Sequence, residues 1–119
     1  MLLAALAFLI AEPTVSELGI EVGPSGLAEL KSKVTGREDA SCQSPRQAVI
    51  LCVIGAGGEV YQFTETGHPA HPSGYFLGFA ERDGTWQLEE RGWTAQDDED
   101  AAQRFFTRAR SAEPAPQRP

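Results

Sequence analysis

The chain has 119 residues and carries 10 Lys+Arg against 17 Asp+Glu, which gives a formal net charge of -7. A chain of this length typically forms one domain, which argues against a multidomain enzyme. The negative charge argues against nucleic-acid binding, because proteins that contact a phosphate backbone usually present a basic face. Hydrophobic residues make up 41% of the chain, and that content is typical of a globular domain rather than a chain disordered throughout.

The N-terminus begins with an apolar run. Residues 2–11 contain no polar side chain, and the run is much shorter than the roughly 20 apolar residues that cross a bilayer. Its length is typical of the apolar region of a secretory signal, about 7–15 residues. We therefore interpret residues 1–11 as a signal peptide, although no Lys or Arg precedes Lys31. The alternative is a buried N-terminal helix that ends at Glu12-Pro13. Export predicts a periplasmic or secreted protein.

Cys42 and Cys52 are the two cysteines of the chain. In a small exported domain such a pair is more often a disulfide than two free thiols. The bridge would close a loop of about 11 residues, and the lost chain entropy of the unfolded state gives roughly 2.8 kcal/mol of stabilisation. Two inert thiols or a reactive thiol are the alternatives. Cys52 lies in an apolar run, where burial raises the pKa of a thiol and makes it unreactive.

The first third of the domain carries weak structural signals. Residues 12–24 contain several Gly and Pro and predict a connector with at most a short strand. A short helix is expected over 24–36, because its leucines and valine recur on one helical face. The polar residues 36–47 predict a loop.

The middle of the chain predicts an antiparallel sheet. Residues 48–54 are continuously apolar and rich in β-branched side chains, as expected of a central strand covered on both faces. The segment Arg82-Asp83-Gly84 predicts a hairpin, because Asp-Gly tolerates the positive φ angles of a tight turn. The further predicted strands and the first turn are residues 59–66, 75–80, 85–91 and 55–58.

The last predicted element is a helix after residue 94. Thr94 precedes Asp97 by three residues, a variant of the capping box. The acids at 97–100 complement the positive end of the helix dipole, so capping explains them better than calcium binding does. The tail, residues 111–119, is rich in proline and predicts disorder. The apolar stripe of the helix consists of Ala101, Ala102, Phe105, Phe106 and Ala109.

These elements predict an α+β domain over residues 12–110. We expect an antiparallel meander of about four strands, with the N-terminal short helix and the C-terminal helix packed on one face. Glu89 and Glu90 are neighbours in a strand and should face opposite sides of the sheet, so they cannot act as a facing pair. The expected core is Tyr75, Leu77, Phe79, Trp86, Phe105 and Phe106.

The segment 67–74, Gly-His-Pro-Ala-His-Pro-Ser-Gly, contains both histidines of the chain. A residue before proline is disfavoured in the α region, so two His-Pro pairs predict extended, polyproline-like backbone. His68 and His71 would then point the same way, about 9 Å apart along the axis. That spacing suits a surface that contacts a partner, and it does not suit a single metal ion, whose ligands must converge.

A resemblance adds to this interpretation. The run TETGHPAHPSG lies after a Tyr-x-Phe strand and before an E-R-D-G-x-W hairpin. Together with the upstream cysteine pair and Gly92-Trp93, it resembles segments of small exported bacterial proteins with no known activity. The resemblance covers roughly residues 42 to 106, and only GHPAHP is distinctive. It implies export and fold, and it does not imply an activity.

The sequence therefore predicts an exported binding or protein-interaction module that is not an enzyme. It predicts no cofactor and no metal, no nucleic-acid partner and no stable membrane span, and it leaves the oligomeric state and the protein or small-molecule partner open. The main alternative is a small metal-binding protein or enzyme that uses His68 and His71. A periplasmic stability or assembly factor is a third possibility. The candidate binding residues are His68, His71, Tyr75, Tyr61 and Trp93.

Overall fold

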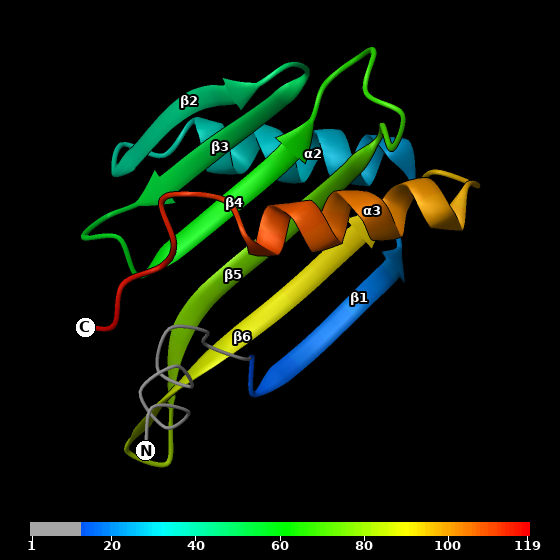
Figure 1. Ribbon diagram of the computed structural model, residues 1–119. Helices are drawn as coiled ribbons and strands as arrows, with labels where there is room; N and C mark the ends of the chain where they lie inside the picture. The colour runs from blue at the N-terminus through cyan, green and yellow to red at the C-terminus, as the bar shows by residue number, and fades with distance from the viewer. Residues whose placement is uncertain (1–12) are drawn as a thin grey trace, which may run out of the picture.

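The computed structural model describes residues 13–119, so the predicted signal peptide lies outside the described residues. The elements, shown in Figure 1, are β1 (Val15–Glu21), α2 (Pro24–Thr35), β2 (Ala40–Arg46), β3 (Val49–Ile54), β4 (Glu59–Thr64), β5 (Ser73–Arg82), β6 (Thr85–Thr94) and α3 (Glu99–Arg110). None of the helices among these residues is long and apolar enough to cross a membrane.

The strands form one six-stranded sheet in the order β1-β6-β5-β4-β3-β2. The pairs from β2 to β6 are antiparallel, as predicted, whereas β1 pairs with β6 in parallel. The α+β class is confirmed, but the expectation of a four-stranded, wholly antiparallel sheet is wrong. The two additional strands, β1 and β2, are the sheet edges. An edge strand needs less apolar surface than a central one, which explains why neither sequence carries a strong strand pattern.

The two helices lie on opposite faces of the sheet, and the expectation that both pack on one face is wrong. Figure 1 shows α3 in front of the sheet and α2 behind it. Neighbouring residues of β4 show the same division, because successive strand side chains alternate between faces. The Gln62 amide donates to the carbonyl of Ala109 in α3, while Phe63 packs in the cluster with Val34 of α2.

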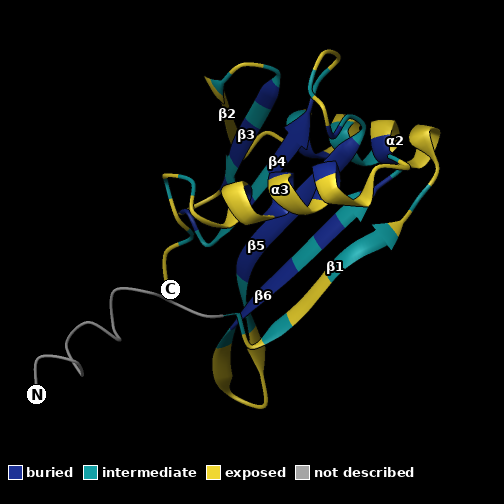
Figure 2. Ribbon diagram, turned by 45° about the vertical axis from the view of Figure 1, so that its right-hand side comes forward, coloured by how far each residue is buried: buried dark blue, intermediate teal, exposed yellow. Residues whose placement is uncertain are grey.

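The core behind α3 matches the prediction in most positions. Tyr75, Leu77, Phe105 and Phe106 are buried together, and Phe79 packs against them while partly exposed. Trp86 is the exception, because 37% of its surface is exposed. It lies near the tip of the β5–β6 hairpin, which extends past α3 as an exposed end in Figure 2.

The buried carboxylate of Glu90 in β6 is hydrogen-bonded to residues of β1, β5 and α3. Glu90 is 0% exposed, and its oxygens accept from the guanidinium of Arg110 at 2.5 and 2.7 Å, from Ser16 Oγ at 2.6 Å and from Tyr75 Oη at 2.5 Å. Burial alone would raise the pKa of Glu90, but the hydrogen bonds from Arg110, Ser16 and Tyr75 outweigh it and lower the pKa. Glu89 faces the other side of the sheet, toward Arg82 and Arg91, as predicted.

Helix α3 has nearly the predicted span but a different cap. The side chain of Asp98 accepts from Ala101 N at 3.1 Å, which makes Asp98 the N-cap. Thr94, the expected capping residue, is the last residue of β6. Beyond the helix, Gln117 N donates to the carbonyl of Gly57 at 2.7 Å. Disorder of residues 111–119 stays a prediction.

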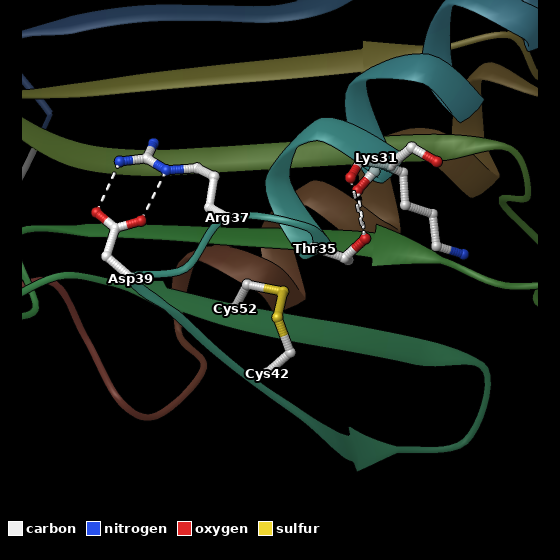
Figure 3. The surroundings of a disulfide bond; sticks show 7 residues. Lys31, Thr35, Arg37, Asp39, Cys42 and Cys52 are labelled. Carbon is white, nitrogen blue, oxygen red and sulfur yellow. Dashed lines mark hydrogen bonds and ion pairs between the residues drawn. A yellow bond between two sulfur atoms is a disulfide. The ribbon is translucent and has the colours of Figure 1, made fainter.

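The predicted disulfide joins Cys42 of β2 to Cys52 of β3. The two residues are direct cross-strand partners. Figure 3 shows the bridge beside α2, with the Arg37–Asp39 ion pair at the connection between α2 and β2. Cys52 is fully buried in the cluster under α2, and Cys42 is exposed. The bridge therefore fastens a polar edge strand to its buried neighbour, β3.

Candidate functional site

Three connections meet at the end of the sheet where β6 stops at Thr94. They are the connection from β1 to α2, the His-Pro segment between β4 and β5, and the connection from β6 to α3. The His-Pro segment is not extended, so the expected polyproline-like geometry is wrong. It forms two successive turns, in which His68 N donates to the carbonyl of Glu65 at 3.1 Å and His71 N to that of His68 at 3.0 Å. Pro69 occupies the second position of the second turn, where its fixed φ is favourable.

His68 belongs to the side of the sheet that α3 covers. Its Nδ1 accepts from Ala70 N at 3.0 Å, which satisfies a backbone donor inside the turn. Its ring meets the edge of Phe105 at a centroid distance of 5.4 Å. Burial lowers the pKa of His68, and the nearby charges of Arg46 and His71 lower it further. The lowered pKa favours the neutral ring, and the contacts of His68 with Ala70 N and Phe105 hold the turn against α3.

His71 faces α2 instead. Its Nδ1 lies 2.9 Å from Oγ1 of Thr64, an oxygen that also accepts from Ser73 N at 2.9 Å. The ring lines a cavity of about 190 Å³ together with Leu27 and Phe63. Because the two imidazoles face different helices, they do not converge on one ligand. Within residues 13–119 no group of three or more His, Cys, Asp or Glu is arranged to hold a metal ion.

The other predicted binding residues are also divided between the faces. Tyr75 is 1% exposed and stacks on Phe106 under α3. Tyr61 is half-buried on the α2 face, stacked on Phe63 at 6.1 Å. A Cβ on Gly92 would meet Phe106 under α3, so the half-buried Trp93 faces the opposite side. The five predicted residues therefore do not form one binding surface.

The His-Pro segment is fastened to the connection between β6 and α3. Gln96 Nε2 donates to the carbonyls of His71 at 3.0 Å and Pro69 at 3.3 Å. Ala95 N donates to the carbonyl of Pro72 at 3.0 Å, and the hydroxyls of Ser73 and Thr94 lie 2.8 Å apart. The histidine loop thus supports the residues that follow β6.

Those residues form one wall of the acidic cleft, a cavity of about 590 Å³ between the end of β1 and the first turns of α3. The opposite wall comes from β1 and its connection to α2. Apolar surface is contributed by the partly exposed Leu18 and Val22 among others. The lining contains no Lys, Arg or His, and its acids are Glu21, Asp97, Glu99 and Asp100.

Sequence reasoning missed this site, because it assigned the acids at 97–100 to helix capping and named none of the residues that line the cleft as a binding residue. The acids at 97–100 are visible as a run, and helix capping accounts for Asp98, Glu99 and Asp100. Glu21 belongs to β1, and it comes opposite this run only because β1 pairs in parallel with β6, where Glu21 is the partner of Thr94. That pairing joins residues more than 70 positions apart in the chain, so no local pattern indicated it.

Comparison with known proteins finds no matching family, no matching curated protein and no matching solved structure.

Proposed function

We propose that this protein is an exported interaction module without catalytic activity, and that its acidic cleft binds a basic segment of a partner protein. The observation that carries the proposal is the composition of the cleft. Four carboxylate side chains line a cavity of about 590 Å³ that contains no basic side chain. A cavity of this size is within the range of ligand-binding sites, about 300–1,000 Å³.

The charges favour a cationic partner over a neutral one. Within residues 13–119, none of the four acids of the cleft has a Lys, Arg or His within 4.0 Å. Capping and the helix dipole account for Glu99 and Asp100 at the start of α3. They do not account for Glu21, which belongs to a strand on the opposite wall. An arriving Lys or Arg would meet carboxylates from both walls.

The apolar side chains of the cleft favour a peptide over a free metal ion. Leu18 and Val22 from the β1 side lie among the acids, and both are partly exposed. A segment in which basic and apolar residues alternate can place its cations on the acids and its apolar side chains between them. A hydrated cation would gain nothing from this apolar surface.

The disulfide supports export. Structural disulfides persist in non-reducing compartments and are rare in reducing ones, and the Cys42–Cys52 bridge fits the former. A periplasmic or secreted location is part of the proposal, as is cleavage of residues 1–11.

The His-dependent alternative has less support. Nδ1 of His68 is used by a backbone amide, and Nδ1 of His71 by the Thr64 hydroxyl. The hydroxyls of Thr64 and Ser73 are buried and hydrogen-bonded within the segment. The Nδ1 atoms of both histidines and the hydroxyls of Thr64 and Ser73 are therefore engaged in holding the loop together.

A peptide titration tests the proposal. The probe is an N-acetylated heptapeptide of alternating Lys and Leu, added to the ¹⁵N-labelled mature protein and followed by amide NMR shifts. We expect saturable shifts over residues 18–24 and 94–103. Exposed ion pairs contribute about 0.2–1 kcal/mol each, so the double substitution Glu21→Gln and Asp97→Asn should weaken binding about fivefold.

The matched control removes the same number of charges elsewhere. Glu38 and Glu81 are exposed and line neither the acidic cleft nor the His71 cavity. The substitutions Glu38→Gln and Glu81→Gln should leave the peptide affinity within about twofold of the wild type, because distant exposed charges are screened. Equal weakening by both pairs of substitutions, or shifts scattered over the whole surface, would contradict a specific site.

A further inference from the structure

A second cavity lies at the opposite end of α3 and has the opposite chemistry. We call it the arginine pocket. Its volume is about 310 Å³, and it forms where the end of β2 meets the residues that follow α3. Its lining residues are Pro45, Arg46, Arg108, Ser111, Ala112 and Glu113.

Arg46 is the unusual residue of this pocket. Its Nη2 is buried and has no hydrogen-bond partner among the described residues. Its Nη1 has only a long contact, 3.5 Å, to Oε1 of Gln62, whose amide nitrogen is already bonded to the carbonyl of Ala109. Buried guanidinium groups are normally paired, so a half-buried Arg46 that lacks a carboxylate partner requires an explanation.

A second unpaired cation lies beside it. Arg108 lines the same pocket, and within residues 13–119 neither arginine has an acid within 4.0 Å. Burial lowers the pKa of Arg46, and the positive charge of Arg108 lowers it further. The two cations are therefore close enough to repel each other. The position of Arg108 in the last turn of α3 is explained by the helix dipole. Arg46 belongs to β2, so the dipole does not explain it.

We propose that the arginine pocket binds a small oxyanion, a phosphate group above all, with Arg46 and Arg108 as charge-assisted donors and the Ser111 hydroxyl as a third donor. A guanidinium presents a planar fork of N–H donors that matches the oxygens of phosphate. The bound oxyanion would supply the partner that Nη2 of Arg46 lacks, after the guanidinium turns toward the pocket. It would also remove the repulsion between the two cations.

Two groups in the pocket oppose an anion. Glu113 is the one acid in the lining and makes no ion pair with either arginine, and the negative end of the α3 dipole lies close by. We therefore expect weak, millimolar binding of free phosphate, and tighter binding after Glu113→Gln. Binding here is independent of the acidic cleft, because that site takes the opposite charge at the other end of the helix.

Amide NMR with inorganic phosphate tests this site. The full mature protein is titrated at pH 7.5, with sodium chloride exchanged for phosphate at constant ionic strength. We expect saturable shifts at residues 45–47 and 108–113. Arg46→Gln and Arg108→Gln should each weaken binding at least about tenfold, because each removes a hydrogen bond between two charged groups.

Arg104→Gln is the matched control, because Arg104 is exposed on the same helix, makes no ion pair with any of residues 13–119 and does not line the pocket. It should retain the wild-type phosphate affinity within about twofold. Linear shifts without saturation in the wild type would overturn the site, and so would an equal loss in Arg104→Gln. Arg108 is exposed, so Arg108→Gln decides the question even if Arg46→Gln does not fold.

Discussion

The cluster around Glu90 gives the sharpest test of how this fold is held together. Its carboxylate is 0% exposed, while the side chain of its ionic partner Arg110 is 41% exposed. Removing one partner of a buried ion pair costs about 3–5 kcal/mol, because a charge is left buried without compensation. Solvent already screens Arg110, and two hydroxyl donors remain on Glu90. We therefore expect Arg110→Gln to lower the free energy of unfolding by about 2–3 kcal/mol.

Urea denaturation measures this loss without adding the salt that would screen the pair. The control is Arg104→Gln, which removes the same charge from the same helix at an exposed position that has no ion pair within the described part of the chain. It should change stability by no more than about 0.5 kcal/mol. Equal, small effects of the two substitutions would refute the reasoning, because the Glu90–Arg110 pair would then contribute no more than surface charge.

The pH dependence supplies an independent check with a defined sign. The pKa of Glu90 is lowered in the folded protein, so its contribution is fully present above the unfolded pKa, about 4.3. It is lost as the pH falls from that value through the folded pKa. Arg110→Gln should therefore reduce the acid-induced loss of stability below about pH 4.3. An unchanged acid slope in this variant would show that other carboxylates cause it.

Three further predictions concern the rest of the fold. Replacing Cys42 and Cys52 by alanine should cost roughly 2.8 kcal/mol of unfolding free energy in a urea titration, and no change would show that the loop is closed equally well without the bridge. Phe106→Ala should cost about 3–5 kcal/mol, because the ring is 1% exposed between Tyr75 and α3, and calorimetry would detect the lower Tm. The pKa of His68 is lowered on folding, so stability should fall as the pH drops below about 6.5, where the unfolded imidazole takes up a proton that the folded ring resists. His68→Gln should flatten that region of the stability curve, and a slope identical to the wild type would assign it to another group.

The sequence predicted the elements whose own residues carry the information. Strand β3 and helix α3 were located because one is continuously apolar and the other has a stripe at helical spacing. Strand β2, Ala-Ser-Cys-Gln-Ser-Pro-Arg, is almost wholly exposed and is held by pairing and by the disulfide. Its polar residues indicated a loop for that reason. The strand status of β1 likewise comes from its long-range pairing with β6.

The positions of the two helices could have been predicted in part from the sequence of the central strand. A strand that is apolar on both faces, as expected for residues 48–54, requires cover on both faces. The structure supplies that cover by dividing the helices, with Cys52 and Ile54 under α2 and Val49 in the cluster under α3. Putting both helices on one face conflicted with this property of β3. The histidine segment misled for a different reason, because the preference of a residue before proline is also compatible with a turn that has Pro69 at its second position, and the hydrogen bond from His71 N to the carbonyl of His68 closes that turn.

The two proposed sites lie at opposite ends of α3, a helix of 12 residues and therefore roughly 18 Å long. Acids at its start and arginines at its end stabilise the helix, because they complement its dipole. A ligand that binds those side chains carries the opposite charge, so the helix dipole repels it. A basic peptide at the acidic cleft approaches the positive end, and an oxyanion at the arginine pocket approaches the negative end. At each site the wall opposite the helix adds a charge that the helix dipole does not account for, Glu21 in one case and Arg46 in the other. Because the screening length at physiological salt is about 8 Å, raising the salt should weaken the exposed cleft more than the half-buried Arg46 site. A steeper salt dependence for phosphate than for the peptide would contradict this assignment of the two charges.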